Sequence, residues 1–124
     1  MAAGVGLMMS ALVLAAASVP LAAKTARALN AKDPGCIVID EVAGQLIASS
    51  AVLFFRFPTG AAAAGAWAAS FLAFRLFDVW KPGPIRGLQE LPGGLGIVID
   101  DALAGLLAFA TTALAALWLT RGAP

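Results

Sequence analysis

Four apolar segments dominate the sequence, at residues 1–23, 42–55, 57–74 and 102–119. A helix needs about 20 apolar residues to cross the hydrocarbon core of a bilayer. The first and fourth segments reach that length, the third nearly does, and the second does if its helix begins near Ile37. Charged residues make up only 12% of the chain, which is about half of what a water-soluble domain usually carries. We therefore predict an all-α fold, an integral-membrane bundle of about four helices formed by one domain over residues 1–124.

A signal peptide is the alternative interpretation of the first segment. Residues 26–28 read "ARA", which resembles a small-x-small cleavage site. However, no basic residue precedes the apolar run, and the run is longer than the usual hydrophobic region of a signal peptide. We therefore favour a membrane helix.

The basic residues predict how this bundle is oriented. Six lie in the connections that follow the first and third segments, and two lie on the opposite side: Lys24, Arg27, Lys32, Arg75, Lys81 and Arg86 against Arg56 and Arg121. An excess of Lys and Arg marks cytoplasmic connections. All seven acidic residues fall on the same predicted side: Asp33, Asp40, Glu41, Asp78, Glu90, Asp100 and Asp101. We therefore expect acidic loops on a cytoplasmic face, with both termini outside.

Two acidic doublets stand in nearly identical surroundings. Residues 37–41 read "IVIDE" and residues 97–101 read "IVIDD", and each run leads into an Ala-Gly pair and an apolar stretch. One Asp can serve as the N-cap of a helix, and a negative charge there is stabilised by the helix dipole. The second acid of each doublet has no such explanation beside an apolar segment, where charges usually mark a site. Two doublets on one face favour a shared carboxylate site.

A third block, "FRLFDVWKPGPIR" at residues 74–86, adds basic residues. Arg75, Asp78 and Lys81 are spaced by three and so share a helix face, as they also would in a plain row of ion pairs. Together with the doublets they suggest a site for a divalent cation and a phosphate, because carboxylates bind hard cations and Lys or Arg binds phosphate. The "PGGLG" run at residues 92–96 is either an anion-binding turn or a flexible connector.

The composition excludes several other chemistries. The absence of His removes imidazole bases and His-ligated zinc, and the single Cys36 cannot form an internal disulfide. A net charge of +1 argues against a nucleic-acid partner. Any reaction must therefore use carboxylates, Lys, Arg, backbone groups or a metal ion.

Three blocks together resemble the phosphatidylglycerophosphatase A family of bacterial membrane phosphatases: "IVIDEVAGQ" at 37–45, "FRLFDVWKPGPIR" at 74–86 and "GGLGIVIDDALAG" at 93–105. The resemblance implies an Mg²⁺-dependent hydrolase of phospholipid biosynthesis in the bacterial inner membrane. Its reaction would convert phosphatidylglycerophosphate to phosphatidylglycerol and inorganic phosphate, with the active site facing the cytoplasm. The resemblance places catalytic and metal-binding roles on Asp40, Glu41, Asp78, Asp100 and Asp101, and substrate binding on Arg75, Lys81 and Arg86.

The chain departs from the family pattern in two places. The family usually has Trp between the two prolines of the third block, where Gly83 stands here. Members also carry an N-terminal "PGTxGS"-like stretch, whereas Met1 opens directly into the first apolar segment, so an N-terminally truncated chain is one expectation.

Three other functions compete with the phosphatase. A small cation carrier would use the acids as an ion relay, and a structural subunit would use only the helices. An alcohol phosphatidyltransferase would need a "DG…AR…G…D…D" signature, which does not occur here. The sequence leaves the oligomeric state open.

Overall fold

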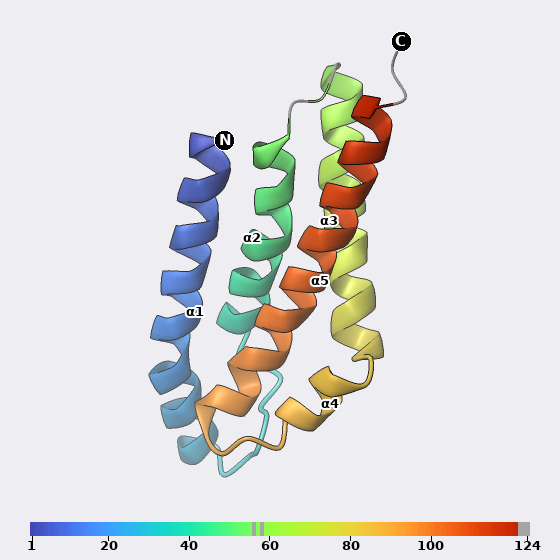
Figure 1. Ribbon diagram of the computed structural model, residues 1–124. Coiled ribbons are helices and arrows are strands. Elements are labelled where there is room, and N and C mark those ends of the chain that lie inside the picture. The colour runs from blue at the N-terminus through green and yellow to red at the C-terminus, as the bar shows by residue number, and fades with distance from the viewer. Residues whose placement is uncertain (56, 58, 122–124) are drawn as a thin grey trace.

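The computed structural model describes residues 1–55, 57 and 59–121, and this part of the chain is built of helices joined by turns and loops (Figure 1). The helices are α1 (Ala2–Ala28), α2 (Ile39–Phe54), α3 (Gly60–Trp80), α4 (Pro84–Leu88) and α5 (Gly94–Arg121). The prediction of an all-α fold is confirmed for the described residues. Arg56, Pro58 and Gly60 between the second and third apolar segments predict a tight turn in the sequence, and two of these residues, Arg56 and Pro58, lie outside the described part.

Three helices are long and apolar enough to cross a membrane: α1, α3 and, within α5, Gly94–Leu119. The second predicted span is shorter, because α2 has 16 residues. At about 1.5 Å per residue this helix is roughly 24 Å long, whereas the hydrocarbon core is about 30 Å thick. The described residues thus contain three candidate spans, and α2 is a shorter fourth helix of the bundle.

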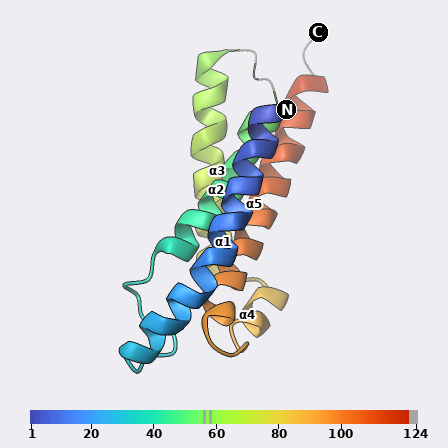
Figure 2. The same ribbon diagram turned by 90° about the vertical axis from the view of Figure 1, so that its left-hand side faces the viewer.

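The centre of the bundle is the pair α2 and α5 (Figures 1 and 2). α1 packs against both members of this pair on one side, and α3 packs against both on the other. More than half of the residues of α2 are buried, whereas α1 and α3 present large apolar side chains such as Val13 and Val79 outward. A helix enclosed in this way does not need to match the thickness of a bilayer by itself.

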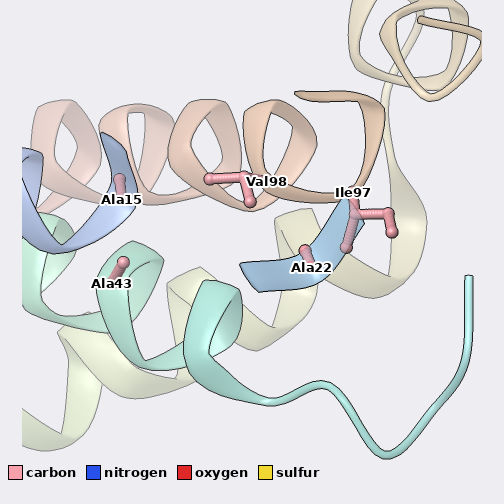
Figure 3. Packing of buried hydrophobic residues seen from close by; sticks show 5 residues of the cluster. All are labelled: Ala15, Ala22, Ala43, Ile97 and Val98. Atoms are coloured by element: carbon pink, nitrogen blue, oxygen red, sulfur yellow. The ribbon is translucent and has the colours of Figure 1, made fainter. Parts of the chain in front are cut away.

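Small residues let these helices approach closely. Figure 3 shows one core cluster, in which Ala15 and Ala22 of α1 meet Ala43 of α2 and Ile97 and Val98 of α5. Alanine at a helix interface brings the backbones together, and in apolar surroundings such packing is a main source of helix association.

The closest approach of α2 and α5 involves the glycines of the two Ala-Gly pairs. A methyl group built on Gly44 would lie 2.5 Å from the backbone oxygen of Asp101, and one built on Gly105 would collide with the backbone oxygen of Gly44. Each glycine stands one helical turn after an acidic doublet. The repeated Ala-Gly pairs therefore bring the two doublets together.

We expect Gly44→Ala to lower the free energy of unfolding by about 1–3 kcal/mol, the usual cost of overpacking a core. The backbone oxygen of Asp101 cannot move without displacing α5, so the acidic doublets should also shift apart. Gly65→Ala is the matched control, because Gly65 lies within α3 with open space around it. Denaturation in detergent, followed by circular dichroism, measures the free energy of unfolding of both variants. Equal stability of the two variants would contradict the close contact.

One end of the bundle collects the residues that the sequence singled out. The start of α2, the end of α3, α4 and the start of α5 all lie at this end, and the start of α1 and the end of α5 lie at the other (Figure 1). α3 ends at Trp80; its C-cap Lys81 has a left-handed backbone with φ of 46°, and Pro82 follows. The sequence prediction that the acidic blocks share one end is confirmed.

Candidate active site

Both acidic doublets are parts of helices rather than of loops. Asp40 and Glu41 lie in the first turn of α2, whose N-cap is Val38. Asp100 and Asp101 lie in the second turn of α5, because this helix begins at Gly94. The expectation of acidic loops is therefore wrong for these residues, and helix capping does not explain the second doublet.

Four carboxylates from three helices form what we call the acidic cluster: Asp40 of α2, Asp78 of α3, and Asp100 and Asp101 of α5. Each is at most 8% exposed. Asp40, Asp78 and Asp100 all lie close enough to Asp101 to interact with it electrostatically. A buried carboxylate is costly unless it is paired or coordinates a metal ion, so four in one place need positive charge beside them.

Two basic side chains from α3 and its C-terminal end flank the acidic cluster. Arg75 Nη1 lies 2.8 Å from Glu41 Oε2 and 3.1 Å from Asp78 Oδ2, so it links α2 to α3. Lys81 Nζ lies 2.5 Å from Asp100 Oδ2 and links the end of α3 to α5. The spacing of three therefore yields one ion pair within α3, while Lys81 pairs with a residue on another helix.

Burial and neighbouring charges shift two groups of this site that lie outside the candidate spans. Burial raises the pKa of Asp40 above its ordinary value, against the opposing effect of the Glu41 N–H, which donates to Asp40 Oδ1 at 3.0 Å. Burial alone would lower the pKa of Lys81, but its hydrogen bond to Asp100 and the charges of the neighbouring carboxylates raise it. Lys81 is therefore a permanent cation beside the cluster at neutral pH.

The other predicted residues lie at the edge of this site. Glu41 is half-exposed and reaches the cluster only through Arg75. Arg86 lies exposed on α4, and within the described residues it has no ion pair or side-chain hydrogen bond. The structure thus brings together four of the five predicted acids and two of the three predicted basic residues, with Glu41 at the edge and Arg86 outside.

Gln89 is a member of the site that sequence reasoning missed. Its Nε2 donates to Asp100 Oδ2 at 2.8 Å, beside Lys81. Gln89 is a neutral residue in the segment between α4 and α5, and neither its charge nor its spacing gives a signal. Its contact with Asp100 depends on how that segment folds back onto α5.

The "PGGLG" run serves packing. Gly93 has φ of 69°, a backbone conformation that favours glycine, and α5 begins at the next residue. A methyl group on Gly94 would collide with the backbone of Val19, so this glycine permits the contact between α5 and α1. This contact explains the glycine at position 94 without an anion.

Two hollows border the site. The larger has a volume of about 910 Å³ and lies between residues 23–33 and 89–97, with Gln89 in its wall. The smaller has a volume of about 270 Å³ and lies between α2 and α3, where apolar side chains surround the Glu41–Arg75 pair. The larger hollow reaches the site at Gln89, and the smaller one reaches it at Glu41 and Arg75.

The donor set suits a hard divalent cation in its chemistry. All four groups of the acidic cluster offer oxygen ligands, which Mg²⁺ prefers. Asp100 Oδ1 is buried and has no hydrogen-bond partner in the described part of the chain, so it has a free coordination position. Among the described residues, no three acidic side chains already converge tightly enough to count as a metal-binding group. The residues fit the ion by their oxygen donors and negative charge, and not by an already formed set of three converging ligands.

Fold and site together define a small helical membrane protein whose carboxylates and cations meet at one end of the bundle. The chain belongs to the phosphatidylglycerophosphatase A family, whose model matches residues 3–116. The family resemblance inferred from the three sequence blocks is thus confirmed.

Two of the curated relatives carry the name of this family. Phosphatidylglycerophosphatase A of Escherichia coli K12 is 41% identical over 86 residues, which cover 68% of this chain and 45% of that protein. Phosphatidylglycerophosphatase A of Haemophilus influenzae is 39% identical over 90 residues, covering 71% and 50%. A protein of Bacteroides thetaiotaomicron with the provisional name phosphatidylinositol-3-phosphatase is 36% identical over 84 residues, covering 68% and 50%. The chain spans about half the length of these relatives, and no solved structure matches it.

Proposed function

We propose that this chain is an Mg²⁺-dependent lipid phosphatase that hydrolyses phosphatidylglycerophosphate to phosphatidylglycerol and inorganic phosphate. The observation that carries the proposal is the acidic cluster, in which four buried carboxylates from three helices meet beside Arg75 and Lys81. Membership of the phosphatidylglycerophosphatase A family supports the substrate class.

In this proposal the acidic cluster holds Mg²⁺, with Glu41 at its edge. Asp100 offers its unpaired Oδ1, and Asp40, Asp78 and Asp101 offer further oxygens. When bound, Mg²⁺ would offset negative charge and polarise the phosphoryl group. A cation in this place would also relieve the repulsion among carboxylates that lie close together in a poorly hydrated site.

The chain's own groups would handle the phosphate and the attacking water. Arg75 and Lys81 already lie at the cluster and carry several N–H donors each, so they can contact phosphoryl oxygens while keeping one carboxylate partner. Positive charge in this position stabilises the charge that develops on those oxygens during transfer. One carboxylate of the cluster would orient the water and accept its proton. We favour direct attack by water over an aspartyl-phosphate, because the sequence has no "DxDx[TV]" motif.

The arrangement speaks against a cation carrier. A carrier needs polar groups along the depth of the membrane, whereas the acidic cluster lies at one end of the bundle. In the described parts of α1, α3 and α5, the segments beyond this end carry no acidic residue.

A panel of lipids tests the proposal. Detergent-solubilised protein should release inorganic phosphate from phosphatidylglycerophosphate in Mg²⁺ and much less from phosphatidylinositol-3-phosphate or phosphatidic acid. Chelation by EDTA should stop the release. Equal rates on all three lipids would contradict the assigned substrate, and no turnover of any of them would contradict the proposed phosphatase activity.

We also propose that the protein lies in the bacterial inner membrane with the acidic cluster facing the cytoplasm, as its basic residues suggest. Cys36 is the single cysteine of the chain, and it is exposed in the segment before α2, at the cluster end. We expect a membrane-impermeant maleimide to leave Cys36 unlabelled in intact spheroplasts and to label it in inverted vesicles. Labelling in intact spheroplasts would contradict this orientation.

A further inference from the structure

The two oxygens of Asp100 have different surroundings. Oδ2 accepts hydrogen bonds from Lys81 Nζ at 2.5 Å and from Gln89 Nε2 at 2.8 Å. Oδ1 is buried and has no partner among the described residues. Two donors on the same oxygen fix the rotation of the carboxylate, and they leave the other oxygen free on a side chain that is 3% exposed.

The two donors differ in what they can do. Lys81 is a cation with three N–H donors, and in the proposed reaction it also serves the phosphate. Gln89 is neutral, so its amide can hold Asp100 without cancelling the negative charge that a metal ion needs. The hydrogen bond from Gln89 does not depend on Lys81, so it would still hold Asp100 if Lys81 bound a phosphate.

The backbone of Gln89 is itself fixed against α5. A methyl group on Gly96 would lie 2.9 Å from the Gln89 carbonyl oxygen, so the first turn of α5 packs directly on this segment. Gln89 lies within a turn that two backbone hydrogen bonds close. The Glu90 N–H donates to the Gly87 carbonyl at 3.2 Å, and the Leu91 N–H donates to the Leu88 carbonyl at 3.1 Å. Gln89 is thus held at both its backbone and its side chain relative to Asp100.

We infer that Gln89 is a positioning residue, which holds Asp100 through Oδ2 so that Oδ1 is presented to the divalent cation. This inference rests on the proposed function for its metal ion. Nothing in the family match or in the relatives' names assigns this residue a role. Partners that orient a metal ligand in this way typically change metal affinity or activity by about 10–100-fold when they are removed.

Gln89→Met tests the inference, because methionine keeps the unbranched shape and removes the amide. Glu90→Gln is the matched control, since Glu90 is the next residue, is exposed and pairs only with Lys32. Mn²⁺ binding to the detergent-solubilised chain without lipid, followed by electron paramagnetic resonance, is the first readout. We expect the dissociation constant to rise about 10-fold in Gln89→Met and to stay within about twofold of wild type in Glu90→Gln.

The second readout separates kcat from KM for phosphate release from phosphatidylglycerophosphate. Gln89→Met should lower kcat about 10-fold at fixed Mg²⁺ with KM within about threefold, because the amide contacts a carboxylate and not the lipid. Circular dichroism checks the helix content, and Gln89→Leu replaces Gln89→Met if the latter misfolds.

Unchanged Mn²⁺ affinity in the Gln89 variant, equal weakening in Glu90→Gln, or a wild type that binds no Mn²⁺ would overturn the inference. Failure of the proposed function looks different. In that case Mn²⁺ binding still depends on Gln89, but no lipid releases phosphate.

Discussion

Asp101→Asn should lower phosphate release by at least about 100-fold, as expected when a group acting directly on the metal ion or the water is lost. Asp101 interacts electrostatically with all three other carboxylates of the acidic cluster, Asp40, Asp78 and Asp100. Asparagine keeps its size but cannot carry the negative charge. A loss of 100-fold corresponds to about 2.7 kcal/mol of transition-state stabilisation.

The stability of the same variant separates a reactive carboxylate from a structural one. Neutralising one of four crowded carboxylates removes repulsion, so the free energy of unfolding of Asp101→Asn should not fall and could rise by about 1 kcal/mol. Unfolding in detergent without Mg²⁺ measures this. A marked loss of stability together with full activity would show that Asp101 belongs to the packing and not to the site.

Lys81→Met should lower the free energy of unfolding by about 3 kcal/mol, because it leaves Asp100 as a buried carboxylate without its cation. The Asp100 side chain is 3% exposed and that of Lys81 is 22% exposed, so water can replace little of the lost interaction. The double variant Lys81→Met with Asp100→Asn should recover most of the loss, since neither partner then carries a buried charge.

Lys32→Met is the control for this pair. Lys32 and Glu90 form an ion pair of similar kind whose side chains are 70% and 77% exposed. Exposed pairs contribute about 0–1 kcal/mol, so the control should be nearly neutral. If Lys81→Met costs no more stability than Lys32→Met, or if the double variant recovers none of the loss, the Lys81–Asp100 pair is not a strong link between the end of α3 and α5.

The meeting of the acidic blocks could be predicted because it depends on patterns along the chain. The two "IVID" runs repeat the same order of apolar residues, acids and an Ala-Gly pair, and the charges of 74–86 follow a helical spacing. The structure adds the reason for the repeat. Gly44 and Gly105 allow α2 and α5 to touch one turn from each doublet.

The starts of the helices were harder to predict because tertiary packing decides them. Residues 94–99 contain two glycines and three β-branched residues, which alone disfavour a helix, yet α5 begins at Gly94. Gly94 fits against α1 and Gly96 fits against the segment before α5, so packing overrides local preference. The acids of the second doublet consequently lie inside a helix.

Contacts that cross the chain had no sequence signal at all. Lys81 and Asp100 are 19 positions apart, and Gln89 and Asp100 are 11 apart, with no periodicity relating them. Arg86 was grouped with the other basic residues by its place in the 74–86 block, but it lies exposed on the short helix α4. Only the folded structure shows that Lys81 and Gln89 contact Asp100, whereas Arg86 lies outside the site.

We propose above that the acidic cluster uses Mg²⁺ to hydrolyse a lipid phosphate. Inorganic phosphate released from phosphatidylglycerophosphate by the detergent-solubilised protein, measured with and without Mg²⁺ for wild type and Asp100→Asn, tests it most directly. We expect Mg²⁺-dependent release by wild type and a loss of at least about 100-fold in Asp100→Asn. No Mg²⁺-dependent release by wild type, or undiminished release by Asp100→Asn, would contradict it.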